Sequence, residues 1–533
     1  MKKQTKVMAT LSTAALLALG FSAVSMAAGW DNSTGAWRYL NNDGTEVVDE
    51  WKSANGNWFY LDSDGVMATD KLIEDESSTK GTKYYYVDQY GAMVKNTWKA
   101  VAMDDDDSTD LDAEYWWYYF GNDGKAYTIK SEDAITKNKL KTINGLKYAF
   151  DEEGHMLYGW TEATAGDHSQ NDDDEKAWRD AKYYFNGWND GHAQTGWAQI
   201  PVEDDDDETQ NYWFYFNGDG EKQANTRKKI NGKYYIFAAD GHMVDEWAFQ
   251  DYNAASDSKI WGADLTSTSN IASISYVNGD GSERKNTWIW AIPDENWIED
   301  DYNDDQYRWF YAGKDGKLAH DQAKKINGKY YAFDDKGRMQ VDFVQVGENN
   351  TGVKKLCDHD EWTAAQWIKE DYATAAGEHA NVYYFSSDED KDGARKTGYQ
   401  NIELADDTYQ FYFQKNGEAK TQYDSKIKKF TVTGLVLKPT SDDDNNYAAI
   451  EGVSVNADGE YVFDGEVKVV TTYGQMNEGE ILVNKQGSIV KNKTVKDEND
   501  QYWKTDANGV IEKKAPDKDA YDKAKKATDS TKW

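Results

Sequence analysis

Short runs of aromatic residues, each closed by a polar turn, recur along this chain. The clearest run is Trp58-Phe59-Tyr60-Leu61, which is rich in strand-forming side chains and ends at Asp62-Ser63-Asp64-Gly65. Glycine supplies the positive φ that such a tight turn requires. Trp51 precedes the run, and the polar link between them contains Asn55-Gly56, a strong hairpin signal. This stretch therefore predicts a small β-hairpin with an aromatic residue on each arm.

The hairpin is repeated, because a single hairpin cannot bury its aromatic rings. Equivalent runs begin 96, 96 and 102 residues apart, at Trp117, Trp213, Trp309 and Phe411. A variant that starts Ile-Asn-Gly recurs at Ile143, Ile230 and Ile326. Such fixed-period similarity indicates units of about three hairpins that have been duplicated. The predicted fold class is all-β, an elongated solenoid of repeated β-hairpins with a β-rich, atypical C-terminal end.

The two ends of the chain differ from the repeats. Lys2, Lys3 and Lys6 precede a mostly apolar segment that ends in small residues at Ala27, as in a secretory signal peptide. Past Thr421 the pattern weakens, which fits either a degraded cap of the array or a separate small β domain. We therefore expect a signal peptide at 1–27, hairpin repeats at 28–424, degenerate repeats or a small β domain at 425–511, and a charged tail at 512–533.

Composition explains what fills the core. The mean hydropathy is -0.91 and the formal net charge is -36, values that would suggest disorder if aromatic residues were scarce. They are abundant, with 22 Trp, 37 Tyr and 17 Phe, and Pro is rare with 4. We therefore expect small aromatic clusters rather than one large core. The negative charge excludes nucleic acid as a partner, and no second apolar stretch is long enough to span a membrane.

Catalytic and metal-binding motifs are weak. No nucleophile-elbow, zinc-protease, P-loop or dinucleotide motif is present, so we expect no enzyme activity and no cofactor. Cys357 is the only cysteine and cannot form an intramolecular disulfide. His155 and His242 occupy equivalent repeat positions, which indicates copying rather than a cluster. Acidic insertions should form solvated hairpin loops; they are Asp104–Asp107, Asp172–Glu175, Asp204–Glu208 and Asp300–Asp305.

One acidic stretch resembles the start of a calcium loop. Asp388, Asp390 and Asp392 precede Gly393 in a D-x-D-x-D-G pattern, but Tyr399 stands where the bidentate glutamate is expected. The Asp-Gly ending also closes most of the hairpins. No metal site is therefore assigned, and these three aspartates remain weak calcium candidates.

Aromatic side chains at the hairpin junctions are the remaining candidates for function. Quaternary ammonium groups bind over indole and phenol faces by cation–π attraction, worth about 0.5–2 kcal/mol per ring. Sugar rings stack on the same faces. Most of the aromatic residues should nevertheless form the core.

The motif Gly-Trp, followed by Trp-x-Tyr-Leu/Phe-x-x-x-Gly-x-Met, resembles the cell-wall-binding repeats of choline-binding surface proteins from Gram-positive bacteria. It is also similar to the glucan-binding repeats of secreted glucosyltransferases. The resemblance covers about residues 29–420 and is clearest at 29–160. It implies a β-hairpin solenoid whose ligand cages combine two tryptophans of one hairpin with a tyrosine of the next and a nearby methionine.

Carried over to this chain, the resemblance implies two complete cages near the N-terminus. Their expected ligand-binding residues are Trp30, Trp37, Tyr60, Trp51, Trp58, Tyr86, Met67 and Met93. Weaker sites are expected where acidic insertions separate the tryptophans, at Trp98 and Trp117, Trp197 and Trp213, and Trp288 and Trp309. At these three sites, counting back from the turn glycine gives Ala149, Ile236 and Ala332 as the third wall. The resemblance therefore predicts that these three cages are open or absent.

The resulting functional hypothesis is a secreted bacterial surface protein that binds the cell wall non-covalently, through teichoic acid choline or a wall glycan. The alternatives are an extracellular polysaccharide-binding protein without choline specificity and a calcium-dependent adhesin or structural surface protein.

Overall fold

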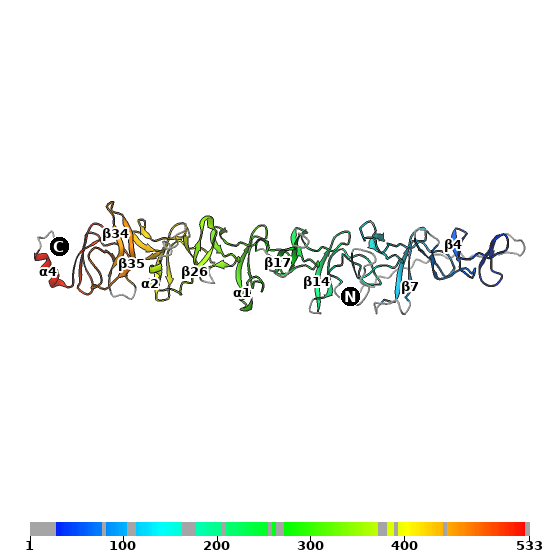
Figure 1. Ribbon diagram of the computed structural model, residues 1–533, viewed down its shortest axis with the longest axis horizontal. Coiled ribbons are helices and arrows are strands. Elements are labelled where there is room, and N and C mark those ends of the chain that lie inside the picture. Colours follow the sequence, from blue (N-terminus) through cyan, green and yellow to red (C-terminus); the bar gives the residue numbers. More distant parts are fainter. Residues whose placement is uncertain are drawn as a thin grey trace. The chain divides into compact units, whose positions relative to one another are not determined.

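The structure, a computed structural model, describes residues 28–76, 81–103, 113–162, 177–204, 208–253, 258–262, 271–370, 381–387, 393–440 and 445–527. The expected signal peptide at 1–27, the insertions Asp104–Asp107 and Asp172–Glu175, and the calcium candidates Asp388, Asp390 and Asp392 lie outside these residues. Nearly all regular structure in the described part is β, in successive antiparallel hairpins, which confirms the predicted fold class (Figure 1). No described helix is long and apolar enough to cross a membrane.

Contacts divide the chain into two units, residues 1–230 with 235–244, and residues 231–234 with 245–533. In the first unit, successive strands pair as two-stranded hairpins: β1 (Gly29–Asp31) with β2 (Arg38–Leu40), β3 (Glu50–Ala54) with β4 (Asn57–Leu61), β5 (Lys71–Asp75) with β6 (Lys83–Val87), β7 (Thr97–Ala102) with β8 (Tyr115–Phe120), β9 (Lys141–Ile143) with β10 (Leu146–Tyr148), β11 (Trp160–Thr161) with β12 (Tyr183–Tyr184), and β13 (Gly196–Glu203) with β14 (Thr209–Phe216). β15 (Thr226–Ile230) follows, and the division between the units falls within β16 (Lys233–Phe237).

A turn capped by its first side chain follows the second strand of several hairpins. After β4, Oδ1 of Asp62 accepts the backbone N–H groups of Asp64 at 3.0 Å and Val66 at 2.8 Å, and its carbonyl oxygen accepts that of Gly65 at 2.9 Å. Gly65 has φ +69°, which an L side chain rarely adopts. The polar turn predicted from the sequence therefore forms through local hydrogen bonds that backbone N–H groups donate to the aspartate at its start.

A recurring backbone hydrogen bond fixes each hairpin against the preceding one. In many hairpins the residue two positions after the turn glycine donates its N–H to a carbonyl oxygen on the second arm of the previous hairpin. The donor–acceptor pairs include Met67 to Trp37 (2.8 Å), Met93 to Trp58 (2.8 Å), Met156 to Trp117 (2.7 Å) and Met243 to Trp213 (2.7 Å). This bond sets the register between neighbouring hairpins.

The methionine at this position also packs against the turn of the following hairpin. A Cβ added at Gly91 would lie 2.8 Å from the Met67 methyl group, and one at Gly124 would lie 2.6 Å from the Met93 sulfur. By contrast, Gly56 in the β3–β4 turn has nothing within 4 Å. Some turn glycines are therefore required both by their positive φ and by the close approach of a methionine.

In the second unit, hairpins continue and then give way to a larger sheet. The first group comprises β17 (Trp247–Asn253) with β18 (Ser258–Gly262) and β19 (Ser275–Tyr276), β20 (Thr287–Ala291) with β21 (Arg308–Ala312), and β22 (Gln322–Ile326) with β23 (Lys329–Phe333) and β24 (Met339–Gln340). Short helical segments lie between strands: η1 (Ile271–Ser273), α1 (Glu299–Asn303), η2 (Glu348–Asn350) and α2 (Ala364–Glu370).

A nine-stranded sheet follows, with strand order β26-β25-β27-β30-β29-β33-β32-β31 and β28 paired to β29. Its strands are β25 (Asp342–Val346), β26 (Lys354–Cys357), β27 (Asn381–Phe385), β28 (Gly398–Glu403), β29 (Thr408–Phe413), β30 (Glu418–Ala419), β31 (Gln422–Asp424), β32 (Lys429–Val432) and β33 (Leu435–Val436). Buried Trp367 and Phe411 pack with Phe343 in its core, so this segment is one sheet rather than a row of separate hairpins. The expected domain limit at 424 falls inside it.

The C-terminal part consists of two three-stranded sheets and a helix. One sheet contains β34 (Tyr447–Val455), β35 (Tyr461–Val470) and β36 (Ile481–Asn484), and the other contains β37 (Thr494–Lys496), β38 (Tyr502–Thr505) and β39 (Ile511–Ala515). α4 (Lys518–Ala527) ends the described chain. This end is β-rich and unlike the repeats, as the sequence predicted.

Candidate ligand-binding aromatic junctions

One tryptophan on the first strand of a hairpin collects several aromatic rings around it. Trp98 on β7 is paired with Tyr119 across the hairpin, with ring centroids 5.1 Å apart. Trp117, two residues before Tyr119, lies on the same face because side chains alternate along a strand. Its ring is 6.5 Å from that of Trp98 at 81°. Tyr148 of the next hairpin completes the group at 4.9 Å and 66°.

We call two such tryptophans and the ring from the next hairpin an aromatic junction. Three further junctions have nearly the same geometry: Trp30 with Trp37 (6.5 Å, 77°) and Phe59 (5.3 Å, 74°), Trp197 with Trp213 (6.3 Å, 81°) and Tyr235 (4.8 Å, 66°), and Trp288 with Trp309 (6.1 Å, 87°) and Tyr331 (4.8 Å, 71°). In a fifth, Trp51 lies 5.1 Å from Tyr85 at 60°, and Trp58 lies on the same strand face as Tyr60. The structure thus brings together the rings of four of the five predicted tryptophan pairs. In the fifth junction, the ring contacts of Trp51 are with Tyr60 and Tyr85.

The predicted third ring was wrong by one residue. Tyr60 pairs with Trp51 in its own hairpin, and it is Phe59 that reaches Trp30. Likewise Tyr85, not Tyr86, reaches Trp51. Tyr86 is buried and donates its hydroxyl hydrogen to Asp70 at 2.6 Å; burial and this hydrogen bond raise its pKa. A one-residue error reverses the face of a strand, which is why the count missed the contact.

The same one-residue shift applies to the three junctions that the resemblance predicted to be open. Ala149, Ile236 and Ala332 are fully buried on the opposite face of their strands. The residues before them are Tyr148, Tyr235 and Tyr331, and these supply the third ring. A ring from the next hairpin therefore contacts the first-strand tryptophan at each of these three junctions, although Tyr148 and Tyr331 are themselves buried.

In three of the five junctions the indole that follows the first-strand tryptophan is exposed to solvent, whereas Trp37 and Trp117 are half-buried. Trp58 and Trp213 are 42% exposed and Trp309 is 38% exposed, whereas the first-strand tryptophans are half-buried among their partners. Met67 and Met93 pack against turn glycines, as described above, so their contact with a ligand stays a prediction. The Nε1 atoms of Trp30, Trp51 and Trp117 are buried without a hydrogen-bond partner among the described residues.

At other contacts between hairpins, a lysine or arginine of the chain itself lies over an aromatic ring. Arg395 lies over Tyr330 at 4.0 Å and over Tyr383 at 5.0 Å, and Lys285 lies over Tyr234 at 4.0 Å. Lys222 lies over Trp160 at 5.5 Å and donates to the carbonyl oxygen of Asp240 at 2.6 Å. Burial lowers the pKa of this ammonium group to about 8. Among the described residues, no lysine or arginine lies over the ten indoles of the aromatic junctions.

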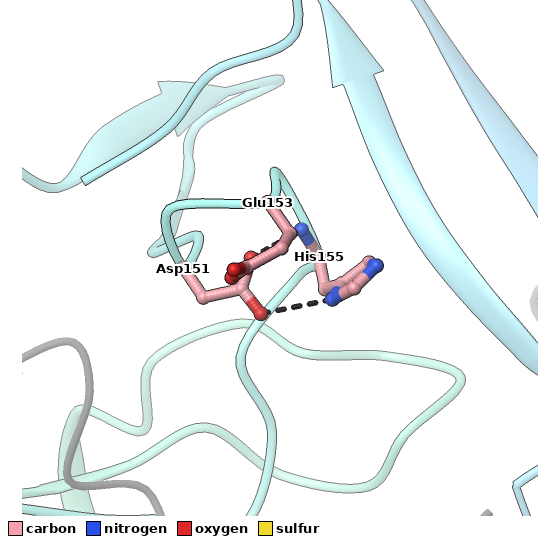
Figure 2. Close-up of side chains that lie close together, drawn as sticks. All are labelled: Asp151, Glu153 and His155. Carbon is pink, nitrogen blue, oxygen red and sulfur yellow. Dashed lines mark hydrogen bonds and ion pairs between the residues drawn. The ribbon is translucent and has the colours of Figure 1, made fainter. Parts of the chain in front are cut away.

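A cluster of titratable groups lies in the turn after β10. Asp151, Glu153 and His155 each offer a ligand atom, and these atoms lie within 4.8 Å of one another (Figure 2). The sequence interpretation of His155 as a simple copy of His242 missed this cluster. Its signal is the spacing Asp-x-Glu-x-His within a single turn.

One acidic insertion is not a solvated loop. Asp301 in α1 is buried and accepts hydrogen bonds from Arg308 at 2.7 Å and Arg338 at 3.2 Å. Burial opposes its ionisation, but these two guanidinium groups hold the pKa of Asp301 below its ordinary value. The expectation of a solvated loop at Asp300–Asp305 is therefore wrong for this residue.

Comparison with known proteins agrees with the predicted resemblance. Residues 48–98 match the family model of the choline-binding repeat. Glucosyltransferase-S of Streptococcus mutans is 26% identical over 223 residues, which are 41% of this chain and 11% of that enzyme. The modular autolysin LytC of Streptococcus pneumoniae is 19% identical with a TM-score of 0.31, over 60% of this chain and 54% of that one. Choline-binding protein F of S. pneumoniae is 16% identical with a TM-score of 0.20, over 82% and 98%.

These comparisons confirm the resemblance to choline-binding repeats. The family match spans β3 to the start of β7 and includes the junction of Trp51, Trp58 and Tyr85. The chain spans about a tenth of the glucosyltransferase and about half of the autolysin.

Proposed function

We propose that this chain is a secreted, non-catalytic protein of the bacterial cell surface, whose aromatic junctions bind quaternary ammonium groups such as the choline of wall polymers. The family match at residues 48–98 supports the class of ligand. The geometry that supports it most is the indole pair, which recurs with centroid distances of 6.1 to 6.5 Å and angles of 77° to 87°. Two faces at right angles allow a cation to lie against both.

Charge favours a cationic ligand over a neutral one. The formal net charge of -36 attracts cations, whereas a neutral glucan gains nothing from it. The chain itself supplies a comparison, since Arg395 and Lys285 lie over tyrosine rings at 4.0 Å between hairpins that lack an indole pair. Rings in these positions therefore accept a cation, and we infer that the indole pairs accept one from outside.

The spacing of the junctions favours a polymer. The junctions of Trp98, Trp197 and Trp288 recur every third hairpin, and in the first unit the long hairpins β7–β8 and β13–β14 extend to the same side in Figure 1. A polymer with many ammonium groups can occupy several junctions of one chain. Because later contacts are then intramolecular, its affinity exceeds that of a single group.

A neutral wall glycan or glucan is the second candidate. The similarity to Glucosyltransferase-S favours it, and sugar rings can stack on the exposed indole faces of Trp58, Trp213 and Trp309. The two candidates differ in how free choline should act. Choline competes for a cation site and has no reason to displace a stacked sugar.

Affinity chromatography tests the proposal. The purified chain is applied to choline resin, dextran and purified wall, and bound protein is eluted with free choline. Retention on choline resin and wall with elution by choline is expected. If the protein is retained on dextran and choline does not elute it, the chain binds glucan rather than choline. If it binds none of the three materials, both proposed functions are refuted.

A further inference from the structure

The turn between β10 and β11 places three metal-ligand groups on one side. Asp151, Glu153 and His155 stand at alternate positions of the tight turn Asp151-Glu152-Glu153-Gly154-His155. Figure 2 shows the two carboxylate groups close together and Nδ1 of His155 turned toward Asp151. Nδ1 lies 2.9 Å from Oδ2 of Asp151, and the three ligand atoms lie within 4.8 Å of one another.

The imidazole is held in place by the neighbouring hairpin. Its ring stacks on Trp116 with centroids 4.1 Å apart at 19°, and the edge of Tyr118 lies at 5.2 Å and 71°. Asp151 is also fixed, since it is buried and its Oδ1 accepts the N–H of His155 at 2.7 Å. The side chains of Asp151 and His155 are therefore already ordered, and they lose little conformational entropy when a ligand binds.

The negative charge of the turn after β10 is not neutralised by an arginine, as it is in the corresponding turn after β23. There, Asp334 occupies the place of Asp151, and the permanent cation Arg338 donates to it at 2.8 Å. In the turn after β10, Asp151 pairs with His155, and among the residues that the structure describes no lysine or arginine pairs with Asp151 or Glu153.

We infer that Asp151, Glu153 and His155 form a binding site for a divalent transition-metal ion of the Zn²⁺ type. Two carboxylates and one imidazole suit such an ion, whereas Ca²⁺ prefers six to eight oxygen ligands. Ligand bonds of about 2.0–2.2 Å place tetrahedral ligand atoms about 3.4 Å apart, so the atoms that lie up to 4.8 Å apart must approach one another and the 2.9 Å contact between Nδ1 and Oδ2 must open slightly. A rotation of the Glu153 side chain, which is exposed, supplies that movement. The inference does not depend on what the aromatic junctions bind.

The chain contains a matched control in the turn after β16. His242 also lies beside an aspartate, with Nδ1 2.7 Å from Asp240, and its ring stacks on Tyr212 at 4.8 Å. Ala238, however, stands where Asp151 stands in the first turn. This turn offers one carboxylate fewer and should not hold the ion.

The test is calorimetric titration of the full chain with Zn²⁺ in the presence of excess Ca²⁺, which occupies nonspecific acidic sites. Saturable binding is expected that weakens at least about tenfold in H155Q and in E153Q but is unchanged in H242Q. D151N should weaken it without unfolding the turn, because Asn217 caps the equivalent turn and its Oδ1 accepts the N–H of Glu221 as Oδ1 of Asp151 accepts that of His155. Absence of saturable binding, equal binding by H155Q and the wild type, or loss in H242Q would each overturn the inference.

Discussion

Replacing Trp213 by alanine should separate ligand binding from folding. Trp213 is 42% exposed, and Trp197 is its aromatic partner at 6.3 Å. Trp197 is different, since it also contacts Tyr215 at 5.1 Å and Tyr235 at 4.8 Å. The W213A variant therefore removes one wall of the junction while its centre stays packed.

The two effects of W213A can be estimated separately. A buried Trp→Ala change costs about 3–5 kcal/mol, so a ring that is nearly half exposed should cost about 2 kcal/mol of unfolding free energy. Loss of one indole from a cation site costs about 0.5–2 kcal/mol of binding free energy. At about 1.4 kcal/mol per factor of ten, choline should bind this junction about 2- to 30-fold more weakly.

Choline titration by calorimetry and urea unfolding measure these quantities on the same protein. W247A is the buried comparison, because Trp247 is 5% exposed and packs on Trp297 and Phe310. It should lower stability by about 3–5 kcal/mol and leave choline binding in the first unit intact. Y90A is the exposed comparison, since Tyr90 is 53% exposed in a turn, and it should change neither property. Unchanged choline binding by W213A, or equal loss in Y90A, would refute the assignment of the junctions.

Four further outcomes follow from the packing. G91A should destabilise the chain more than G56A in urea unfolding, because both glycines have positive φ (+80° and +83°) but only Gly91 is in close contact with a methionine; equal effects would contradict this. D301A should lower the free energy of unfolding by about 3–5 kcal/mol, because it leaves two guanidinium groups without their buried partner. Since the pKa of Asp301 is lowered in the folded state, the difference in stability between the wild type and D301A should shrink as pH falls through that pKa, which acid unfolding curves measure. The folded pKa of about 8 for Lys222 lies below its ordinary value of 10.5, so the unfolded state binds more protons between these values and stability should rise with pH there; K222M should lack this rise. Burial raises the pKa of Cys357 to about 12, so its thiol should react with a disulfide reagent only on unfolding, and rapid reaction of the native chain would refute this.

The sequence by itself determined the hairpin and most of the aromatic pairs. Trp51, the run from Trp58 to Leu61 and the Asp-x-x-Gly turn specify a hairpin locally, because strand alternation and turn hydrogen bonds involve residues close in the chain. The indole pairs at Trp98 and Trp197 could be predicted for the same reason, since each partner lies within one hairpin.

The tertiary structure decided what comes from the next hairpin. Phe59 rather than Tyr60 reaches Trp30 because the hydrogen bond from Met67 to Trp37 sets the register between hairpins, and a shift of one residue turns a strand's other face toward its neighbour. The packing of Trp116 on His155 and the burial of Asp301 likewise join residues far apart in the chain. Local pattern fixes which side chains share a strand face, but only the packing of one hairpin on another determines which rings and charges that face meets.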